Sequence, residues 1–315
     1  MTTTPAPSTE FQLRPATAAD KANVAALIFA STNAWYQANR GVTAFSGPPS
    51  DCKIFPTVYE RLDPGCCLVA EEVQTGRLAG SCFYHPRPTH VSVGIVNTHP
   101  DYFGRGVARQ MLQAVLMIAD REQKSVRLVS SGMNLDSFSL YNRAGFIPRA
   151  LFQDVMVPVP VNGLDAAAPG GIAHIRPATA NDAPAMARLE RALVGVEREK
   201  DFRYFIENPE GIWSVSLFEE NGIEGFMVSC AHPAMNMIGP GVARTPGSAI
   251  SLLYTELNKH QGKSPVVLAP ADAPGLVQTL YHWGGRNIEV HFGQVRGHWT
   301  PPTGLVFPTF LPETG

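Results

Sequence analysis

The sequence predicts an α/β protein that consists of two similar halves. Apolar runs typical of strands alternate along the chain with amphipathic runs typical of helices. The segment LRPATAAD at Leu13–Asp20 recurs as IRPATAND at Ile175–Asp182. Each copy predicts a short strand followed by a helix that Thr or Asp caps. A self-match of this length indicates a duplicated domain.

A stretch rich in Pro, Gly and Ala separates the two halves. The residues from Pro158 to Gly171 read PVPVNGLDAAAPGG, which is typical of a linker. We therefore expect a first domain over residues 11–157, a linker over 158–173 and a second domain over 174–315. A length of 315 residues suits two domains of ordinary size.

The composition argues against several classes of protein. An apolar fraction of 44% and a charged fraction of 17% are typical of a globular protein with an ample core. A net charge of −2 gives no broad attraction to nucleic acid. The first residues show no basic segment followed by an apolar one, and no apolar run reaches membrane-spanning length. We expect a cytoplasmic protein with no nucleic-acid partner and no membrane partner.

The cysteines do not indicate disulfide or metal chemistry. They form no C-x-x-C pair, and their odd number argues against a disulfide framework. The run Cys66–Ala70 predicts a buried strand, in which cysteine serves as a small apolar residue. The five cysteines are Cys52, Cys66, Cys67, Cys82 and Cys230.

A glycine-bearing turn between a strand and a helix is the most informative feature of the chain. The run Val91–Val96 predicts the strand, and the amphipathic run that begins at Val107 predicts the helix. Glycines at 104 and 106 let the backbone approach a phosphate, which free N–H groups and the helix dipole would face. Arg105 and Arg109 add positive charge at the mouth of the turn. Neither the P-loop string nor the dinucleotide fingerprint with its third small residue occurs here.

A second segment strengthens the prediction of a phosphate ligand. Asn134–Phe146 (NLDSFSLYNRAGF) follows a strand predicted over Ser125–Ser131. Asn134 and Ser137 offer polar groups at a helix N-terminus, and Gly145 marks the end of that helix.

Together these two segments resemble the GNAT family, the Gcn5-related N-acetyltransferases. The family's loop pattern, Gln/Arg-x-x-Gly-x-Gly/Ala, matches Phe103–Ala108 except at its first place. The family's pattern Asn-x-x-Ala/Ser-x-x-Leu-Tyr-x-x-x-Gly-Phe matches Asn134–Phe146 without a gap. The resemblance implies two GNAT-like domains of α/β class, the second degenerate. Each is expected to have a central, mostly antiparallel mixed sheet flanked by helices.

The resemblance also implies roles for individual residues. The acyl thioester would meet backbone N–H groups at Val96 and Thr98, and the pyrophosphate would meet those from Gly104 to Ala108. Tyr141 would be the general acid that protonates the leaving thiolate; alternatively it is a core aromatic residue, as the parallel Tyr281 suggests. The expected cofactor-binding residues are Val96, Thr98, Phe103, Gly104, Arg105, Gly106, Val107, Ala108, Arg109, Asn134 and Ser137.

No general base stands out from the sequence. Many family members use water to carry the proton, so a dedicated base is not required. A metal site made by His85, His90 and His99 would need a convergence that their spacing does not give, and we expect no metal. The candidate bases are His90, Asn97, His99, Glu71 and Glu72.

The second half repeats the later elements in eroded form. Two strands around Glu220–Gly222 predict a hairpin, and a helix and a strand are expected over Ser248–His260 and Pro265–Ala269. With Leu140 aligned on Leu280, Gly104 falls on Arg244 and Gly106 on Pro246, which has no N–H. A competing alignment places Gly239–Arg244 on the loop. We expect weak or no acyl-CoA binding in this half, which would shape the acceptor site or a homodimer interface.

The sequence thus predicts an acyl-CoA-dependent N-acyltransferase, with acetyl-CoA as the most favoured co-substrate. The acyl group would pass to an amine of a small molecule or peptide by direct attack in a ternary complex. The segment Ser31–Cys52, which sets the acceptor in GNATs, does not identify it. The alternatives are a non-catalytic acyl-CoA sensor and a scaffold whose C-terminal half binds a protein.

Overall fold

The computed structural model describes residues 10–312, which divide into two compact units. The first unit comprises residues 10–85 and 93–118, and the second comprises 86–92 and 119–312. These units do not coincide with the two sequence repeats, because most of the first repeat's later elements belong to the second unit. We describe each unit by itself.

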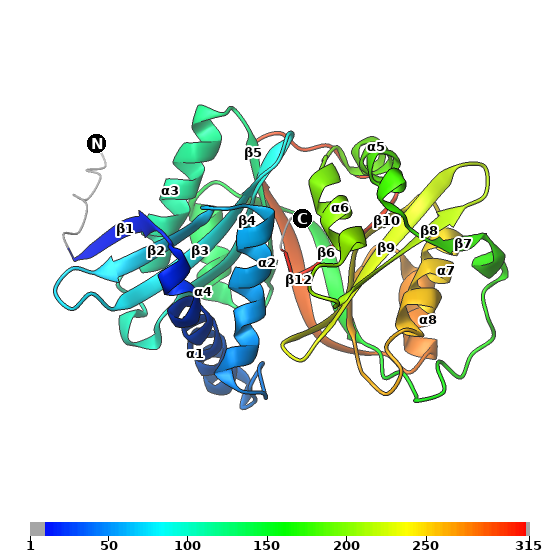
Figure 1. Cartoon of the computed structure of the whole chain (residues 1–315), viewed down its shortest axis with the longest axis horizontal. Coiled ribbons are helices and arrows are strands. Elements are labelled where there is room, and N and C mark those ends of the chain that lie inside the picture. Colours follow the sequence, from blue (N-terminus) through cyan, green and yellow to red (C-terminus); the bar gives the residue numbers. More distant parts are fainter. Residues whose placement is uncertain (1–9, 313–315) are drawn as a thin grey trace. The chain divides into compact units, whose positions relative to one another are not determined.

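The first unit contains four strands in the order β1-β2-β3-β4. Phe83 on β3 stacks on Tyr59 of α2, with ring centroids 4.4 Å apart. A Cβ added at Gly80 would instead meet Val107 and Met111 of α3. Helices α1 and α2 therefore cover one face of these strands and α3 covers the other (Figure 1). The elements are β1 (Phe11–Pro15), α1 (Lys21–Arg40), α2 (Ile54–Leu62), β2 (Cys67–Glu72), β3 (Leu78–Pro86), β4 (His90–Thr98) and α3 (Val107–Arg121).

The second unit contains a larger mixed sheet in the order β5-β12-β6-β11-β10-β9-β8-β7. The first residues of β4 pair in parallel with β5. Its strands are β5 (Ser125–Ser131), β6 (Ile147–Met156), β7 (Ile175–Pro177), β8 (Trp213–Glu219), β9 (Ile223–His232), β10 (Met235–Ala243), β11 (Val266–Pro270), β12 (Arg286–Arg296) and β13 (Leu305–Phe307), the last paired with β10.

Helices cover both faces of this second sheet. Phe226 on β9 packs on Phe202 of α6, with ring centroids 4.7 Å apart. A Cβ added at the adjacent Gly225 would meet Leu252 of α7, so α6 and α7 lie on opposite faces. The helices of the unit are α4 (Leu135–Arg143), α5 (Ala183–Val194), α6 (Glu199–Glu207), α7 (Pro246–Leu257) and α8 (Pro274–His282).

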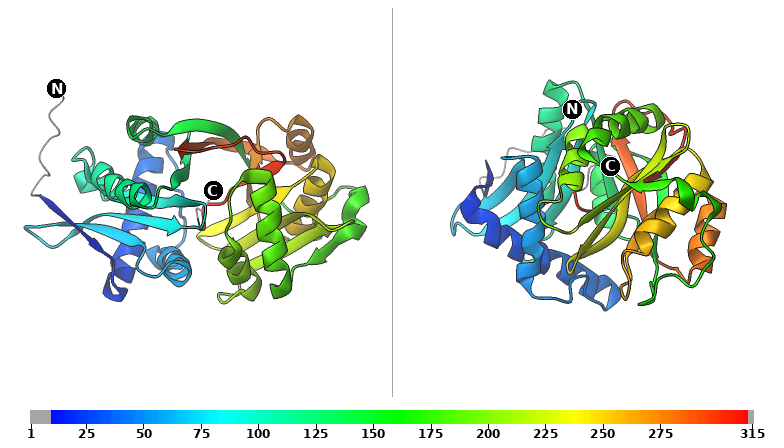
Figure 2. Two further views of the ribbon diagram at one scale, coloured as in Figure 1. Left: turned by 90° about the horizontal axis from the view of Figure 1, so that it is seen from above. Right: turned by 45° about the vertical axis from the view of Figure 1, so that its right-hand side comes forward.

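The two repeats exchange their last strands. The final strand of the first repeat, β6, pairs with β11 of the second repeat. The final strand of the second repeat, β12, pairs with β5 of the first. The two exchanged strands also pair with each other in antiparallel fashion, and they run side by side in both ribbon views (Figures 1 and 2). The repeats therefore cannot separate without breaking this sheet.

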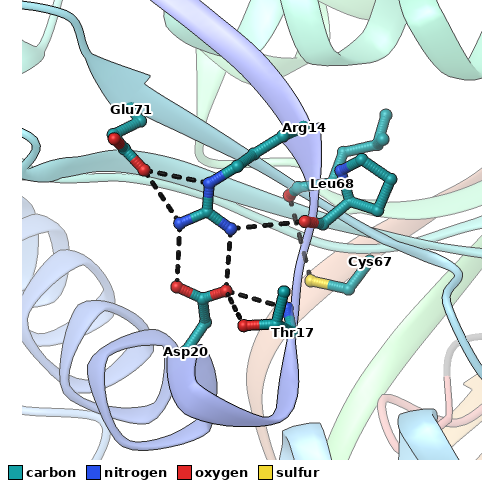
Figure 3. A network of polar contacts seen from close by, with 7 residues as sticks. Arg14, Thr17, Asp20, Cys67, Leu68 and Glu71 are labelled. Carbon is teal, nitrogen blue, oxygen red and sulfur yellow. Dashed lines mark hydrogen bonds and ion pairs between the residues drawn. The ribbon is translucent and has the colours of Figure 1, made fainter.

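The repeated segment near the start of each half builds the same ionic cluster. The Arg14 guanidinium donates to both carboxylate oxygens of Asp20, at 2.8 and 2.9 Å, and to Glu71 (Figure 3). In the second repeat Arg176 binds Asp182 in the same bidentate way and reaches Glu219. Asp20 and Asp182 each also accept a backbone N–H, from Thr17 and Thr179 respectively. Thr17 and Thr179 are the N-caps of the short 3-10 turns before α1 and α5, and Asp20 and Asp182 are the N-caps of those helices, although none of the four side chains accepts a cap hydrogen bond from the helix that it precedes.

The arginine in each cluster holds the pKa of its aspartate well below the usual range. Both carboxylates therefore stay charged in the folded protein far into acid.

The structure confirms most of the local elements that the sequence predicts. Strand β5 covers Ser125–Ser131 as expected, α3 begins at Val107, and β8 and β9 form the hairpin. Helix α7 differs from the prediction because it begins two residues earlier, at Pro246, and ends at Leu257. Within residues 10–312, no helix combines the length and apolar character needed to cross a membrane.

Candidate acyl-CoA site

The loop between β4 and α3 adopts a backbone shape that glycine favours. Gly104 and Gly106 have φ angles of +76° and +80°, in the left-handed region. A Cβ added at either position would meet no atom within 4 Å. The backbone conformation, rather than a lack of space, therefore explains both glycines. A side chain at either place would strain this conformation by about 1–2 kcal/mol.

The N-terminus of α3 leaves a row of N–H groups without helical partners. The first helical hydrogen bond runs from the N–H of Gln110 to the carbonyl of Gly106, at 3.1 Å. The N–H groups of Val107, Ala108 and Arg109 precede that bond and have no partner inside the helix. Such a row, with the positive end of the helix dipole behind it, binds anions.

The loop itself uses the N–H groups of Phe103 and of one predicted donor, Arg105. The N–H of Phe103 donates to the carbonyl of Pro100, and that of Arg105 donates to the carbonyl of Tyr102, both at 3.2 Å. Among the described residues, no carbonyl accepts from the N–H of Gly104 or Gly106. The donors best placed for an anion are therefore those of Gly104 and of Gly106 to Arg109.

The side chains of the loop also differ in their surroundings. Arg105 forms an ion pair with Glu10 and lies over the rings of Phe11 and Tyr102, at 5.3 and 4.9 Å. Its guanidinium is thus held by the first strand and its neighbours. Phe103, which replaces the family's Gln or Arg, is 49% exposed, and Arg109 is exposed.

Val96 and Thr98 lie in the outer part of β4. The parallel pairing of β4 with β5 covers only His90–Ser92 of the nine residues of β4. Val96 and Thr98 are half-buried and share one face of the strand. Asn97 between them is buried, and its side-chain amide reaches the hydroxyl of Thr32 on α1 at 3.4 Å.

Asn134 and Ser137 lie at the N-terminus of α4, in the second unit. Asn134 is the N-cap, and its Oδ1 accepts the N–H of Ser137 at 3.0 Å. Ser131 accepts the N–H groups of Met133 and Asn134 on its hydroxyl. The side-chain oxygen of Asn134 thus has a structural role, which leaves its amide nitrogen and the hydroxyl of Ser137 as candidate ligand contacts.

Tyr141 lies on α4 and is half-buried. Its ring meets Phe146 edge to face, with centroids 5.9 Å apart, and the Tyr141 carbonyl accepts the N–H of Phe146. The parallel Tyr281 on α8 is 42% exposed and donates its hydroxyl proton to Gln153. The predicted site residues therefore form two groups, the loop residues in the first unit and the α4 residues in the second.

The candidate bases all have structural partners. Glu71 binds Arg14, and Glu72 accepts from Thr75 and Tyr102, which lowers the pKa of Glu72. His99 accepts the N–H of Asp101 on Nδ1 and so caps a short turn. His90 is fully buried beside the hydroxyl of Thr89, at 3.0 Å.

The structure contains two buried histidine–aspartate pairs that the sequence does not predict. His85 Nδ1 lies 2.6 Å from Asp63 Oδ2, with both side chains buried. His291 Nδ1 lies 2.8 Å from Asp154 Oδ1, and burial raises the pKa of Asp154. The two residues of each pair are 22 and 137 positions apart in the sequence, so no local pattern indicates either pair.

Burial keeps three of the cysteines in the thiol form. Burial raises the pKa of the Cys52 thiol to about 12 and also raises the pKa of Cys67 and Cys230. A thiolate is therefore disfavoured at these positions. Over residues 10–312, no three His, Cys, Asp or Glu side chains gather as a metal site would require.

The matching helix start in the second repeat is built differently. Gly239–Ala243 lie inside β10, so the competing alignment of the second loop is wrong. Helix α7 begins at Pro246, one residue off the preferred alignment, and Thr245 is its N-cap. The hydroxyl of Thr245 accepts the N–H of Ser248 at 3.1 Å. Only residues 244–245 separate β10 from α7, whereas residues 99–106 separate β4 from α3.

Comparisons with known proteins identify the family of the chain. The model of the acetyltransferase (GNAT) family matches residues 32–146, and an acetyltransferase (GNAT) domain model matches residues 186–290. A comparison with curated proteins gave no match.

Solved structures with the same fold extend over nearly the whole chain. A Pyrococcus horikoshii protein described as an acetyltransferase has a TM-score of 0.74 at 15% identity, over 99% of each chain. A GCN5-related N-acetyltransferase from Sphaerobacter thermophilus has a TM-score of 0.61 at 17% identity, over 92% of this chain and 96% of its own. A tandem GNAT protein from the clavulanic acid biosynthesis pathway has a TM-score of 0.59 at 14% identity, over 92% and 100%. The chain therefore belongs to the GNAT acetyltransferase family and carries two GNAT domains in tandem.

Proposed function

We propose that the chain is an acyl-CoA-dependent N-acyltransferase whose single acyl-CoA site belongs to the first repeat. The observation that carries this proposal is the start of α3, with its two left-handed glycines and its unpartnered N–H groups. A diphosphate carries charge that such a row of donors and a helix dipole stabilise. Acetyl-CoA is the proposed co-substrate, and the acceptor is an amine of a small molecule or peptide.

The residues of the chain have distinct roles in this proposal. The N–H groups of Gly104 and of Gly106 to Arg109 bind the pyrophosphate. Backbone N–H groups at Val96 and Thr98 polarise the thioester carbonyl and stabilise the oxyanion that forms on attack. Asn134 and Ser137 contact the pantetheine arm.

The chemical step is a direct attack by a neutral amine. The amine nitrogen forms a bond to the acyl carbon, and the carbon–sulfur bond breaks as the carbonyl re-forms. Tyr141 donates its phenolic proton to the leaving sulfur, and water carries the proton that the amine loses. The buried cysteines take no part, because their thiols do not ionise readily.

The test is thiol release from acetyl-CoA in the presence of a panel of small amines and peptides. Turnover with at least one amine supports the proposal. Saturable acetyl-CoA binding without thiol release for any amine would instead favour the non-catalytic sensor, and the absence of binding would exclude both.

A further inference from the structure

The C-terminal segment of the chain pairs with the outer part of β10 in the second repeat. Strands β10 and β11 pair in parallel only at Met237 and Ile238. The pairing of β10 with β9 then shifts register between Ile238 and Gly241, and Gly239 has a φ angle of +134°. Beyond this bulge Gly241–Ala243 pair in antiparallel fashion with Leu305–Phe307, which form β13. The outer part of β10 therefore has a strand from the end of the chain as its partner.

The first repeat has a comparable interruption. Its parallel pair, β4 and β5, is joined only at His90–Ser92, and Val96 and Thr98 lie farther along β4. Under the proposed function these two residues meet the thioester. The position of β13 along β10 therefore corresponds to that of the acyl-CoA arm along β4. This correspondence rests on the proposed function, whereas the pairing of β13 does not.

The segment that follows β13 is anchored by buried side chains. Phe307 is fully buried in a core cluster that includes Ile238 of β10, Leu257 of α7 and Leu276 of α8. Strand β13 also contacts β11, so it lies against both strands of the interrupted pair. Leu311 is fully buried, and the ring of Phe310 packs on His291 at 4.7 Å. A peptide with this pattern would bind as an added strand with apolar anchors.

The start of α7 leaves fewer N–H groups for an anion than the start of α3 does. Pro246 has no N–H, and the N–H of Ser248 already donates to Thr245. The connection from β10 to α7 has two residues in place of eight. The second repeat therefore lacks the loop that would cradle a diphosphate.

We propose that Leu305–Leu311 is a built-in peptide ligand of the second repeat, bound by strand addition to the outer part of β10. We call this binding place the strand site: Gly241–Ala243 of β10 together with β11. The strand site is a peptide-binding site that a segment of the same chain occupies. Its occupation leaves the chain with one acyl-CoA site.

The first experiment cuts the folded, full-length chain. A specific protease sequence replaces Pro301–Thr303, which are exposed. After cleavage, the released end should stay with the protein through gel filtration. It should leave in mild denaturant, and a labelled peptide of residues 304–315 should then bind on return to buffer. The same peptide with Phe307→Asp should bind at least tenfold more weakly, and a scrambled peptide should not bind.

Two outcomes of this experiment would overturn the proposal. One is that the cut segment leaves the native protein at once without lowering its melting temperature. The other is that the Phe307→Asp peptide binds as tightly as the native sequence.

The second experiment measures how many acetyl-CoA molecules the uncut chain binds. One equivalent is expected, and two equivalents of similar affinity would contradict an occupied second repeat. No binding at all would remove the proposed function, yet the peptide exchange would still decide whether the strand site exists. The two proposals therefore fail in distinguishable ways.

Discussion

Helices α3 and α7 begin at equivalent places in the two repeats, but they differ in how the N–H groups of their first turn are satisfied. A helix N-terminus presents N–H groups that its own turns cannot satisfy. In the first repeat Gly106 precedes the helix and leaves Val107, Ala108 and Arg109 to an outside partner. In the second, Thr245 satisfies the N–H of Ser248, and Pro246 has no N–H. A few residues thus decide how many N–H groups each helix end leaves open to an anion.

Other parts of the two repeats remain alike. Arg14 and Arg176 hold Asp20 and Asp182 through equivalent pairs of hydrogen bonds. Structural clusters have therefore been kept in both halves, whereas the features proposed for acyl-CoA binding are present in one. Substitutions at matched positions of the two repeats should show which residues stabilise the fold and which take part in acyl-CoA binding or catalysis.

The largest difference is expected between the two matched tyrosines. Tyr141→Phe removes the proposed proton donor and should lower kcat by about 100- to 10,000-fold, because general acids contribute that much. Tyr281→Phe, the matched control, should leave kcat unchanged although it removes a hydrogen bond to Gln153. Steady-state kinetics on a confirmed amine would measure both. Full turnover by the Tyr141 variant would exclude it as the acid.

The arginine clusters should respond equally in the two repeats. Asp20→Asn and Asp182→Asn each remove the charge that accepts from arginine and should lower the free energy of unfolding by about 1–3 kcal/mol. Denaturant unfolding followed by two probes would measure this loss. A large loss in one repeat with none in the other would contradict the equivalence of the clusters.

These clusters also predict a pH dependence. The pKa of each aspartate is lower in the folded chain than in the unfolded chain. At a pH between these two pKa values, the unfolded chain therefore binds more protons than the folded chain does. The stabilisation is therefore full above about pH 4 and is lost as the pH falls through the folded pKa. Below pH 4, the melting temperature of either Asn variant should fall less steeply with decreasing pH than that of the parent protein.

A smaller effect is expected at the glycine before α3. Gly106→Ala places a side chain in the left-handed region, which costs about 1–2 kcal/mol and tilts the neighbouring N–H groups. The Kd for acetyl-CoA should rise about 5- to 30-fold. Gly211→Ala is the matched control, since Gly211 has a φ of +71° and no atom near a Cβ. Calorimetric titration should find its acetyl-CoA affinity unchanged, and equal weakening by both variants would argue against a site at α3.

The smallest effect is expected at the capped start of α7. Thr245→Ala removes an N-cap hydrogen bond and should cost about 1 kcal/mol of unfolding free energy. Acetyl-CoA binding should not change, because this helix end is not part of the proposed site. A weakened acetyl-CoA complex in this variant would mean that the second repeat takes part in binding.

The sequence by itself determined the duplication, the family and most local elements. Strand β5, the start of α3 at Val107 and the Asn134 cap are local features, set by side-chain periodicity and by the conformational preferences of a few residues. The sequence showed glycines at 104 and 106, and the structure added that both have a left-handed backbone. The assignment of site residues to acyl-CoA, and of domain limits at 157 and 174, stays a prediction.

Only the tertiary structure decided which strands and side chains meet. The exchange of β6 and β12 joins β5 to a strand more than 150 residues later, through backbone groups that every sequence shares. The pairing of β13 with β10, the hold of Glu10 on Arg105 and the His85–Asp63 pair are likewise contacts between distant segments. Local patterns specify what a segment becomes, but its partner depends on the burial and hydrogen bonding of the whole fold.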